Sequence, residues 1–203
     1  YTGQIFDMAE ITRLGHAAGC MVGFDLAHAA GNIPLDLHRW DVDWAVWCTY
    51  KYMNAGPGAP GGCFVHARHG SDSDLNRFAG WWGHDKANRF EMAPGFEPLA
   101  GAEGWQLSNP PILSLAAVRA SLDVFRNVGY MAPLRGKSLL LTGYLEWLLD
   151  ERVGMITPRE PERRGAQLSL KVLGARDLFS RLEAAGVSVD WRESDVIRVA
   201  PTP

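Results

Sequence analysis

The sequence predicts an α/β fold in which helices cover a mostly parallel sheet, followed by a small α+β unit. Over residues 6–66, apolar strand-like segments alternate with segments of helical pattern, which is typical of a sheet with covered faces. After residue 164 the predicted order becomes strand, helix, strand and strand, which indicates a separate, smaller unit. The 203 residues are enough for one sizeable core, or for one domain and part of another.

The first predicted helix begins after Asp7, whose side chain is suited to cap the first turn, and it ends at Gly19. Glu10 follows Asp7 by three residues, as in a capping box. Phe6 and Ile11 have the spacing of a hydrophobic staple, in which two apolar side chains pack across the helix start. These signals together predict a well-defined N-terminal helix.

Three strands are predicted in the first half of the chain, at residues 21–25, 44–48 and 62–66. The segment 44–48 is apolar without interruption, which favours a strand buried on both faces. We expect the strand at 62–66 to pair with it. Because ligands collect at the carboxyl ends of strands in such sheets, Asp25 and Lys51 are candidate site residues.

Residues 71–107 lack a regular pattern and are predicted to form a long loop, with Gly80-Trp-Trp-Gly-His-Asp85 at its centre. Long loops inside compact domains are usually functional, and we expect the two tryptophans to meet a ligand or a second subunit. Helices are predicted at 112–128 and 131–151. The small unit then contains a strand at 166–172, a helix at 176–185, and strands at 187–191 and 195–199.

Composition and charge argue against several classes of function. The formal net charge is −3 and the pI about 6.1, so no basic field is available for nucleic acid or an anionic membrane surface. No segment approaches the roughly 20 apolar residues of a membrane span. Three irregularly spaced cysteines in apolar surroundings argue against a disulfide framework and for a reducing compartment: Cys20, Cys48 and Cys63. The run 159–164 mixes arginine with glutamate and is expected to be a solvated hinge.

Lys51 lies just after the apolar strand, between two tyrosines and before a loop rich in glycine and proline. Burial at the mouth of a strand would lower the pKa of a lysine, and a deprotonated lysine can form a Schiff base with an aldehyde. Asp25 could keep a pyridine nitrogen protonated, so the pair suggests pyridoxal phosphate. His28, three residues after Asp25, is placed to face the same ligand. The alternative is that Asp25 caps a turn and Lys51 pairs with a surface acid.

Other chemistries have weaker support in the sequence. Cys63, His66 and His69 have metal-like spacing, but a zinc site needs a closed set of ligands and strand alternation separates Cys63 from His66. We therefore expect no metal site. No Gly-x-Ser-x-Gly elbow and no phosphate-binding glycine pattern is present. Arg198, on a predicted strand, is suited either to bind a carboxylate bidentately or to remain a surface residue.

Several motifs, in order, resemble kynureninase over nearly the whole chain. They are Gly23-Phe-Asp25-Leu-Ala-His28-Ala, Asp43-Trp-Ala-Val-Trp-Cys-Thr-Tyr50-Lys51-Tyr52-Met-Asn-Ala-Gly, Gly80-Trp81-Trp-Gly-His84, Leu107-Ser-Asn109-Pro-Pro-Ile-Leu, Leu140-Leu-Thr-Gly-Tyr-Leu-Glu and Ile197-Arg198-Val-Ala-Pro. The resemblance implies a pyridoxal phosphate enzyme of the aspartate aminotransferase fold (fold type I). It also implies a cytoplasmic homodimer with the active site at the subunit interface.

The reaction implied by this resemblance is hydrolysis of L-kynurenine or 3-hydroxy-L-kynurenine to anthranilate or 3-hydroxyanthranilate plus L-alanine. It would proceed through a pyridoxal phosphate aldimine and Cβ–Cγ cleavage, in tryptophan catabolism and NAD biosynthesis. Lys51 is similar to the cofactor lysine and general base, and Tyr50 to a proton relay that also contacts the cofactor. The other implied cofactor residues are Asp25, His28, Trp81 and Asn109, and the implied substrate residues are Arg198, His84 and Asn109.

The resemblance also sets the expected domain organisation. Residues 1–130 are expected to form the C-terminal part of the large, cofactor-binding domain, and residues 131–203 a linking helix and an incomplete small domain. The family's N-terminal share of the site and its terminal helix are expected to lie outside this chain. Two alternatives stay open. One is a cysteine desulfurase-like enzyme, whose lysine usually follows a histidine rather than Tyr50; the other is a non-catalytic fragment that serves dimerisation or binding.

Overall fold

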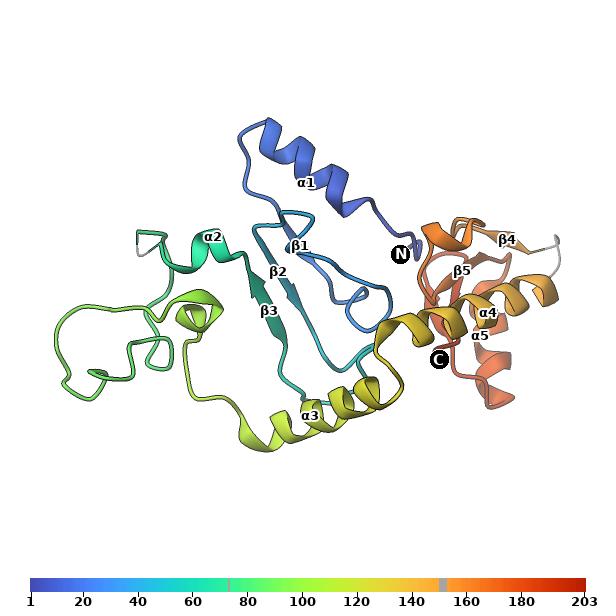
Figure 1. The fold of residues 1–203 in the computed structure, drawn as a ribbon. Helices are drawn as coiled ribbons and strands as arrows, with labels where there is room; N and C mark the ends of the chain where they lie inside the picture. Colours follow the sequence, from blue (N-terminus) through green and yellow to red (C-terminus); the bar gives the residue numbers. More distant parts are fainter. Residues whose placement is uncertain (73, 150–152) are drawn as a thin grey trace. The chain divides into compact units, whose positions relative to one another are not determined.

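The computed structural model describes residues 1–72, 74–149 and 153–203. These residues form two compact units (Figure 1). The lysine unit consists of Asp7–Ala30 and Leu35–Val124, and the C-terminal unit of Tyr1–Phe6, Gly31–Pro34 and Phe125–Pro203. The sequence-based domain boundary after residue 130 stays a prediction.

The lysine unit is built on a three-stranded sheet, and all three predicted strands are confirmed with slightly shorter bounds. Strand β1 (Gly23–Asp25) pairs in parallel with β2 (Trp44–Trp47), and β3 (Gly62–Val65) pairs with β2 in antiparallel fashion. The order β1-β2-β3 places the carboxyl ends of β1 and β2 at one edge of the sheet. This edge carries the first two candidate site residues.

The prediction that β2 is buried on both faces is wrong for this chain. Ala45 is fully buried, but Trp44 and Val46 keep 44% and 43% of their surface exposed. The alternation follows the pleat of the strand, because successive side chains point to opposite faces. Only one face of β2 is covered within the described residues, so the apolar sequence alone overstated its burial.

Helix α1 (Met8–Ala17) is capped as predicted, since the Asp7 carboxylate accepts a hydrogen bond from the Glu10 amide at 2.9 Å. The rest of the predicted helix start is wrong. The Glu10 side chain pairs with Arg13 instead of returning to Asp7. Phe6 and Ile11 are 60% and 41% exposed, so they form no buried staple. Arg13 thus replaces the Asp7 backbone as the partner of the Glu10 carboxylate, and solvent covers much of Phe6 and Ile11.

The remainder of the lysine unit is largely irregular, as the sequence predicts for residues 71–107. It contains α2 (Ala67–Gly70), the 3-10 helix η1 (Gly101–Trp105) and α3 (Ile112–Asn127) up to Val124. Helices α2 and η1 were not predicted from the sequence, while α3 agrees with the predicted helix to within one residue at its end.

A charged cluster lies at the amino end of β2, opposite to the edge that carries Lys51. The buried Asp43 carboxylate accepts hydrogen bonds from the Val22 amide at 2.6 Å, His16 Nε2 at 2.9 Å and His69 Nε2 at 2.7 Å, and also from Arg68. Burial by itself would raise the pKa of Asp43, but these hydrogen bonds, led by that of Arg68, hold it well below its usual range. The cluster joins α1, β2 and α2.

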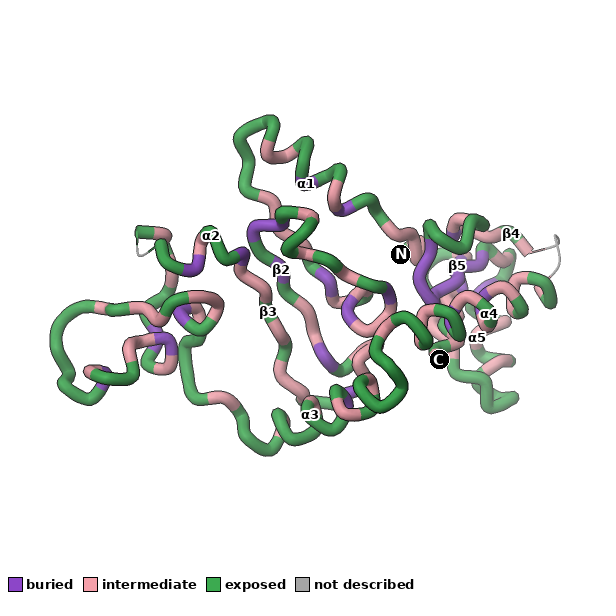
Figure 2. The backbone as a smooth tube through the Cα atoms, in the orientation of Figure 1, coloured by how far each residue is buried: buried purple, intermediate pink, exposed green. Residues whose placement is uncertain are grey.

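The C-terminal unit packs two helices with a four-stranded sheet of order β4-β5-β7-β6, in which every pair is antiparallel. Its core is formed largely by β5 and β7, whose buried apolar residues are Leu168, Leu170, Val196 and Ile197. Buried backbone is concentrated around β5 in Figure 2. The elements are α4 (Met131–Leu149), β4 (Gly154–Met155), the 3-10 helix η2 (Pro161–Arg163), β5 (Leu168–Lys171), α5 (Ala175–Ala184), β6 (Asp190–Arg192) and β7 (Val196–Val199).

The predicted elements of this unit are confirmed in type and order, with differences at their ends. Strand β5 begins two residues later than predicted, at Leu168. Strand β6 begins three residues later than predicted, at Asp190. The predicted end of the second long helix, at residues 150–151, lies outside the described residues. The two-residue strand β4 carried no sequence signal.

The start of the chain completes the C-terminal unit. The Thr157 hydroxyl donates to the Thr2 carbonyl at 2.6 Å, and the Ser169 hydroxyl donates to the Tyr1 carbonyl at 2.6 Å. Asn32 accepts a hydrogen bond from the Ala166 amide at 2.9 Å. Segments 1–6 and 31–34 therefore supply hydrogen-bond acceptors for backbone and side-chain donors of residues 157–169.

The prediction of a solvated hinge at 159–164 is wrong for Arg164. Its side chain is only 1% exposed, and its Nη1 lies 2.6 Å from Glu146 Oε2 on α4. Arg159 pairs with the other oxygen of Glu146 at 2.8 Å and stays exposed. A buried guanidinium needs such a partner because the loss of hydration is otherwise uncompensated.

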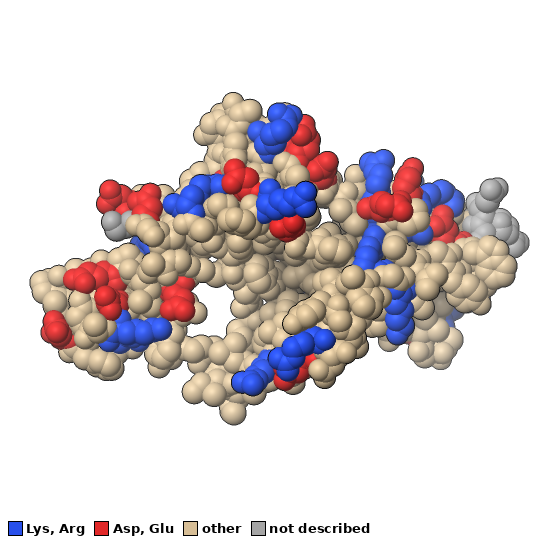
Figure 3. Space-filling view, in the orientation of Figure 1, with Lys and Arg blue, Asp and Glu red and all other residues tan. Residues whose placement is uncertain are grey.

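Acidic and basic side chains are interspersed over the face drawn in Figure 3, and no single-sign field covers it. None of the described helices combines the length and apolar character needed to cross a membrane.

Candidate active site

Asp25 and Lys51 lie at the same edge of the lysine unit's sheet. Asp25 is the last residue of β1 and pairs in register with Val46 of the neighbouring parallel strand, while Lys51 follows the end of β2 by four residues. The Asp25 side chain is exposed, and its Oδ1 accepts a hydrogen bond from the Ala27 amide at 2.8 Å. The predicted turn cap is therefore present, and it uses one of the two carboxylate oxygens.

The backbone around Lys51 is held in a tight turn. The buried Thr49 hydroxyl donates to the Pro60 carbonyl at 2.7 Å, and the Asn54 amide donates to the Lys51 carbonyl at 2.9 Å. Ser121 of α3 donates its hydroxyl hydrogen to the Met53 carbonyl. These bonds fix the direction in which the lysine leaves the sheet.

The Lys51 ammonium lies 5.7 Å from the centre of the Tyr50 ring, within the range of a cation–π contact. Among the residues that the structure describes, Lys51 forms no salt bridge, so the alternative of a surface acid partner finds no support there. Tyr50 is 53% exposed. His28 and Tyr52 face each other edge-on, with ring centres 6.1 Å apart, and thus place aromatic surface beside the lysine turn.

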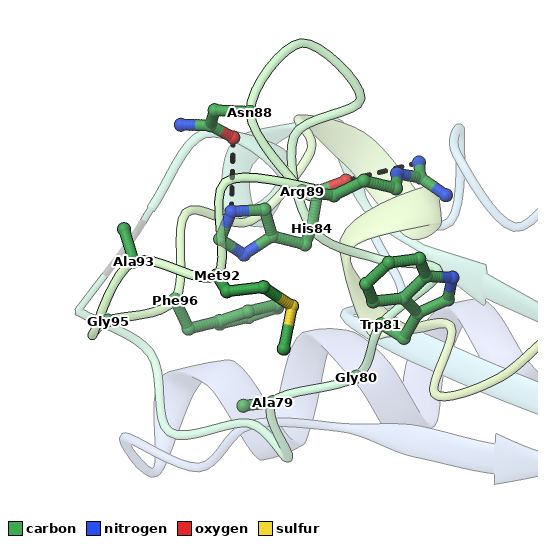
Figure 4. Close-up of a pocket in the computed structure, with 10 residues that line it drawn as sticks. All are labelled: Ala79, Gly80, Trp81, His84, Asn88, Arg89, Met92, Ala93, Gly95 and Phe96. Carbon is green, nitrogen blue, oxygen red and sulfur yellow. Dashed lines mark hydrogen bonds between the residues drawn. The ribbon is translucent and has the colours of Figure 1, made fainter.

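Trp81 and His84 line a separate pocket of about 230 Å³ in the long loop (Figure 4). His84 Nε2 lies 3.1 Å from Asn88 Oδ1, and the other ring nitrogen accepts from the Glu97 amide at 3.3 Å. Trp81 is 41% exposed and meets Phe90 edge-on at 5.2 Å. The pocket is lined by Ala79, Gly80, Trp81, His84, Asn88, Arg89, Met92, Ala93, Gly95 and Phe96.

Glycine is required at position 80, just before Trp81. A Cβ at Gly80 would lie 2.3 Å from the Leu107 Cα and 2.6 Å from the Gln106 carbonyl oxygen. The two backbone segments can approach so closely only without a side chain between them. Arg89, largely buried, places its guanidinium 5.1 Å from the Trp82 ring centre and so supports the same loop from inside.

The other two predicted site residues are Asn109, before a helix, and Arg198, on a strand. Asn109 is exposed and precedes α3, in the same unit as Lys51. Arg198 lies on β7 of the C-terminal unit, and its guanidinium contacts the Asp190 carboxylate of β6. Its predicted preference for a carboxylate is thus met within the chain by Asp190, a residue that the sequence analysis did not single out.

Several contributors to the site carried only weak sequence signals. Thr49 lies within the lysine motif, and its buried hydroxyl could have been suspected from its place beside an apolar strand. Ser121 lies 68 residues from its partner Met53, so no local pattern announces that contact. Asp190 is eight residues from Arg198, and only the register of β6 and β7 brings them together.

Comparison with known proteins agrees with the sequence motifs. Residues 134–203 match the family model described as the kynureninase C-terminal domain. The whole chain aligns with the kynureninase of Koribacter versatilis at 62% identity over 207 residues, and with that of Xanthomonas euvesicatoria at 63% over 210 residues.

The chain belongs to the kynureninase family. It spans about half the length of the curated relatives it matches, since all of its residues align with 49% of each of these two proteins. Of the residues implied by the kynureninase resemblance, Arg198 lies in the C-terminal unit and the others lie in the lysine unit.

Solved structures support the same fold assignment for this kynureninase-family chain. The cysteine desulfurase of Thermococcus onnurineus NA1 superposes with a TM-score of 0.76 at 15% identity, covering 98% of this chain and 52% of its own. An alanine–glyoxylate aminotransferase from Nostoc gives a TM-score of 0.68 at 19% identity, covering 99% of this chain and 53% of its own. At such low identity the likeness concerns the fold alone, which is that of the fold type I enzymes.

Proposed function

We propose that the full-length protein is a pyridoxal phosphate-dependent kynureninase. It hydrolyses the Cβ–Cγ bond of L-kynurenine or 3-hydroxy-L-kynurenine, and releases anthranilate or 3-hydroxyanthranilate plus L-alanine. The observation that carries this proposal is the placement of Lys51 and Asp25 at the ends of two adjacent parallel strands, in a chain 62% identical to kynureninases. The activity belongs to tryptophan catabolism and NAD biosynthesis.

The residues at this edge fit pyridoxal phosphate. Lys51 offers a half-buried amine for the aldehyde group, and the exposed Asp25 carboxylate offers an acceptor for the pyridinium N–H. His28 adds a ring beside the lysine turn, and the exposed Tyr50 hydroxyl is available to the phosphate. When bound, pyridoxal phosphate supplies a cationic ring that withdraws the electron pair left at the substrate α-carbon.

Each residue of the chain then has a defined task. Lys51 holds the cofactor before substrate arrives and afterwards removes the proton at the substrate α-carbon. Asp25 keeps the pyridine nitrogen protonated. Tyr50, beside Lys51, relays a proton between substrate and solvent. Arg198 binds the α-carboxylate, and its planar guanidinium suits that group. At the aryl end, His84 and Asn109 contact the substrate ring.

We further propose a cytoplasmic homodimer in which Trp81 reaches the phosphate of the partner subunit's cofactor. The 41% exposure of Trp81 and the rigid backing of its loop support such a contact. Residues 1–130 would belong to the large domain and residues 131–203 to the small one. If the site is shared in this way, a mixture of Lys51→Ala and Trp81→Ala subunits regains part of the activity that each variant lacks. No recovery on mixing would contradict a shared site.

The function is tested on the full-length protein. Addition of pyridoxal phosphate should produce a new absorbance band that Lys51→Ala abolishes and that Lys86→Ala, a change at an exposed lysine of the same unit, retains. Release of fluorescent anthranilate from kynurenine tests the reaction. Sulfide release from cysteine without anthranilate would decide for a desulfurase, and binding without either product would indicate a non-catalytic protein.

A further inference from the structure

We propose that Asp190 is a positioning residue that holds the Arg198 guanidinium by one edge and so presents its other edge to the substrate carboxylate. The inference rests on the proposed function, in which Arg198 binds that carboxylate. Asp190 itself would not touch the substrate.

The register of β6 and β7 brings the two side chains together. Asp190 is directly opposite Arg198 in this antiparallel pair, so both side chains project from the same face of the sheet. Arg192, two residues after Asp190, projects from that face as well, and its Nε lies 3.0 Å from Asp190 Oδ2. Trp191 projects from the other face, where the Arg176 guanidinium lies 5.6 Å from its ring centre.

The contact to Arg198 uses one edge of the guanidinium. Both Nε and Nη2 of Arg198 contact the same oxygen of Asp190, Oδ2. A guanidinium has five N–H groups, and this contact leaves the end formed by its two terminal nitrogens for a second, bidentate carboxylate. The Arg198 side chain is only 15% exposed, so a fixed partner restricts it to few orientations.

The charges around Asp190 keep this end attractive to an anion. One carboxylate would neutralise a single guanidinium, but Asp190 is shared between Arg192 and Arg198. The three side chains together therefore carry one net positive charge. Arg192 and Asp190 are 52% and 45% exposed, so solvent screens their pair, whereas Arg198 is shielded.

The opposite role would be competition, in which Asp190 occupies Arg198 and the substrate must displace it. The two roles predict opposite effects of Asp190→Asn on binding. Loss of a positioning carboxylate weakens the binding of a carboxylate-bearing ligand, whereas loss of a competitor strengthens it.

The test uses the full-length, cofactor-loaded protein and a matched pair of ligands. The first, 2-amino-4-phenylbutanoate, carries the α-carboxylate but has no γ-ketone to cleave; the second, 3-phenylpropylamine, lacks the carboxylate. We expect Asp190→Asn to weaken the first ligand about tenfold, as for the loss of one charge-assisted contact, and to leave the second unchanged. In turnover, KM for kynurenine should rise while kcat stays the same. Asp195→Asn is the control, because Asp195 lies three residues beyond Arg192 on the same hairpin and its carboxylate contacts Ser194.

Arg198→Ala separates failure of the two proposals. If this variant still prefers the carboxylate-bearing ligand to the same degree, the assignment of Arg198 in the proposed function is wrong. If Arg198→Ala removes that preference but Asp190→Asn leaves or strengthens it, the positioning role of Asp190 is overturned. Equal weakening of both ligands in Asp190→Asn would indicate a structural role only and would overturn it as well.

Discussion

Asp43→Asn removes the negative charge from the cluster that joins α1 and α2 to β2. Asparagine fills nearly the same volume, so no cavity opens. Its NH2 group replaces one carboxylate oxygen, however, and so faces either Arg68 and His69 or His16 and the Val22 amide, which are donors to the native carboxylate. The side chain of Asp43 is only 4% exposed, and water cannot easily replace the lost charge. The change in the free energy of unfolding therefore measures what the charge of one buried carboxylate contributes to stability.

Breaking a buried ion pair by removing one partner costs about 3–5 kcal/mol. We expect about 3 kcal/mol, near the lower limit, because Arg68 keeps its ion pair with Asp41. Since 1.4 kcal/mol corresponds to a factor of ten, local opening around the cluster becomes roughly a hundredfold more frequent.

Hydrogen exchange of the full-length protein measures this opening. Amides of α1, β2 and α2 should exchange faster in Asp43→Asn, while those of β5 and β7 in the C-terminal unit stay unchanged. Asp36→Asn, at an exposed aspartate of the same unit, should leave both sets unchanged.

The effect also depends on pH in a defined direction. The native pKa of Asp43 lies below that of an unfolded aspartate, about 3.9, so its stabilisation is complete above that pH and is lost as the pH falls. The difference between wild type and Asp43→Asn in urea unfolding should shrink below about pH 4. A difference under about 1 kcal/mol at pH 7, or one that grows on acidification, would refute the reasoning.

Three further predictions concern the lysine unit. Gly80→Ala should cost about 1–3 kcal/mol and expose the Trp81 loop to proteolysis, since the new methyl group would strike the backbone of Leu107. Ser121→Ala should cost about 1 kcal/mol and speed hydrogen exchange in the lysine turn, because the Met53 carbonyl loses its donor. Burial, followed by the charge of Arg68, lowers the pKa of His66, so protonation favours the unfolded state below about pH 6.5. His66→Gln should therefore flatten the loss of stability between pH 7 and 5, as measured by urea unfolding.

Local patterns in the sequence were sufficient for much of the fold and for the lysine edge. Strands β1, β2 and β3 have strong apolar signals, and two parallel strands necessarily bring Asp25 and Lys51 to one edge. These inferences need only the strand periodicity and the direction of the chain.

The sequence could not predict contacts that depend on long-range register. Arg164 looked solvated because its partner, Glu146, lies on a helix 18 residues earlier. The Asp190–Arg198 contact depends on where β6 begins, and the predicted start was three residues too early. Trp44 looked buried because apolar composition does not say which elements cover a strand.

The involvement of residues 1–6 and 31–34 in the C-terminal unit has a consequence for how this unit can change over time. A recombination event that exchanged only residues 134–203 would bring in Ala166 without the Asn32 side chain that accepts from its amide. The unit is inherited in three separate pieces of coding sequence. A Cβ at Gly165 would lie 2.5 Å from the Asn32 amide nitrogen. Substitutions near Gly165 should therefore be accompanied by changes at Asn32, although Asn32 and Ala166 are 134 residues apart in the sequence.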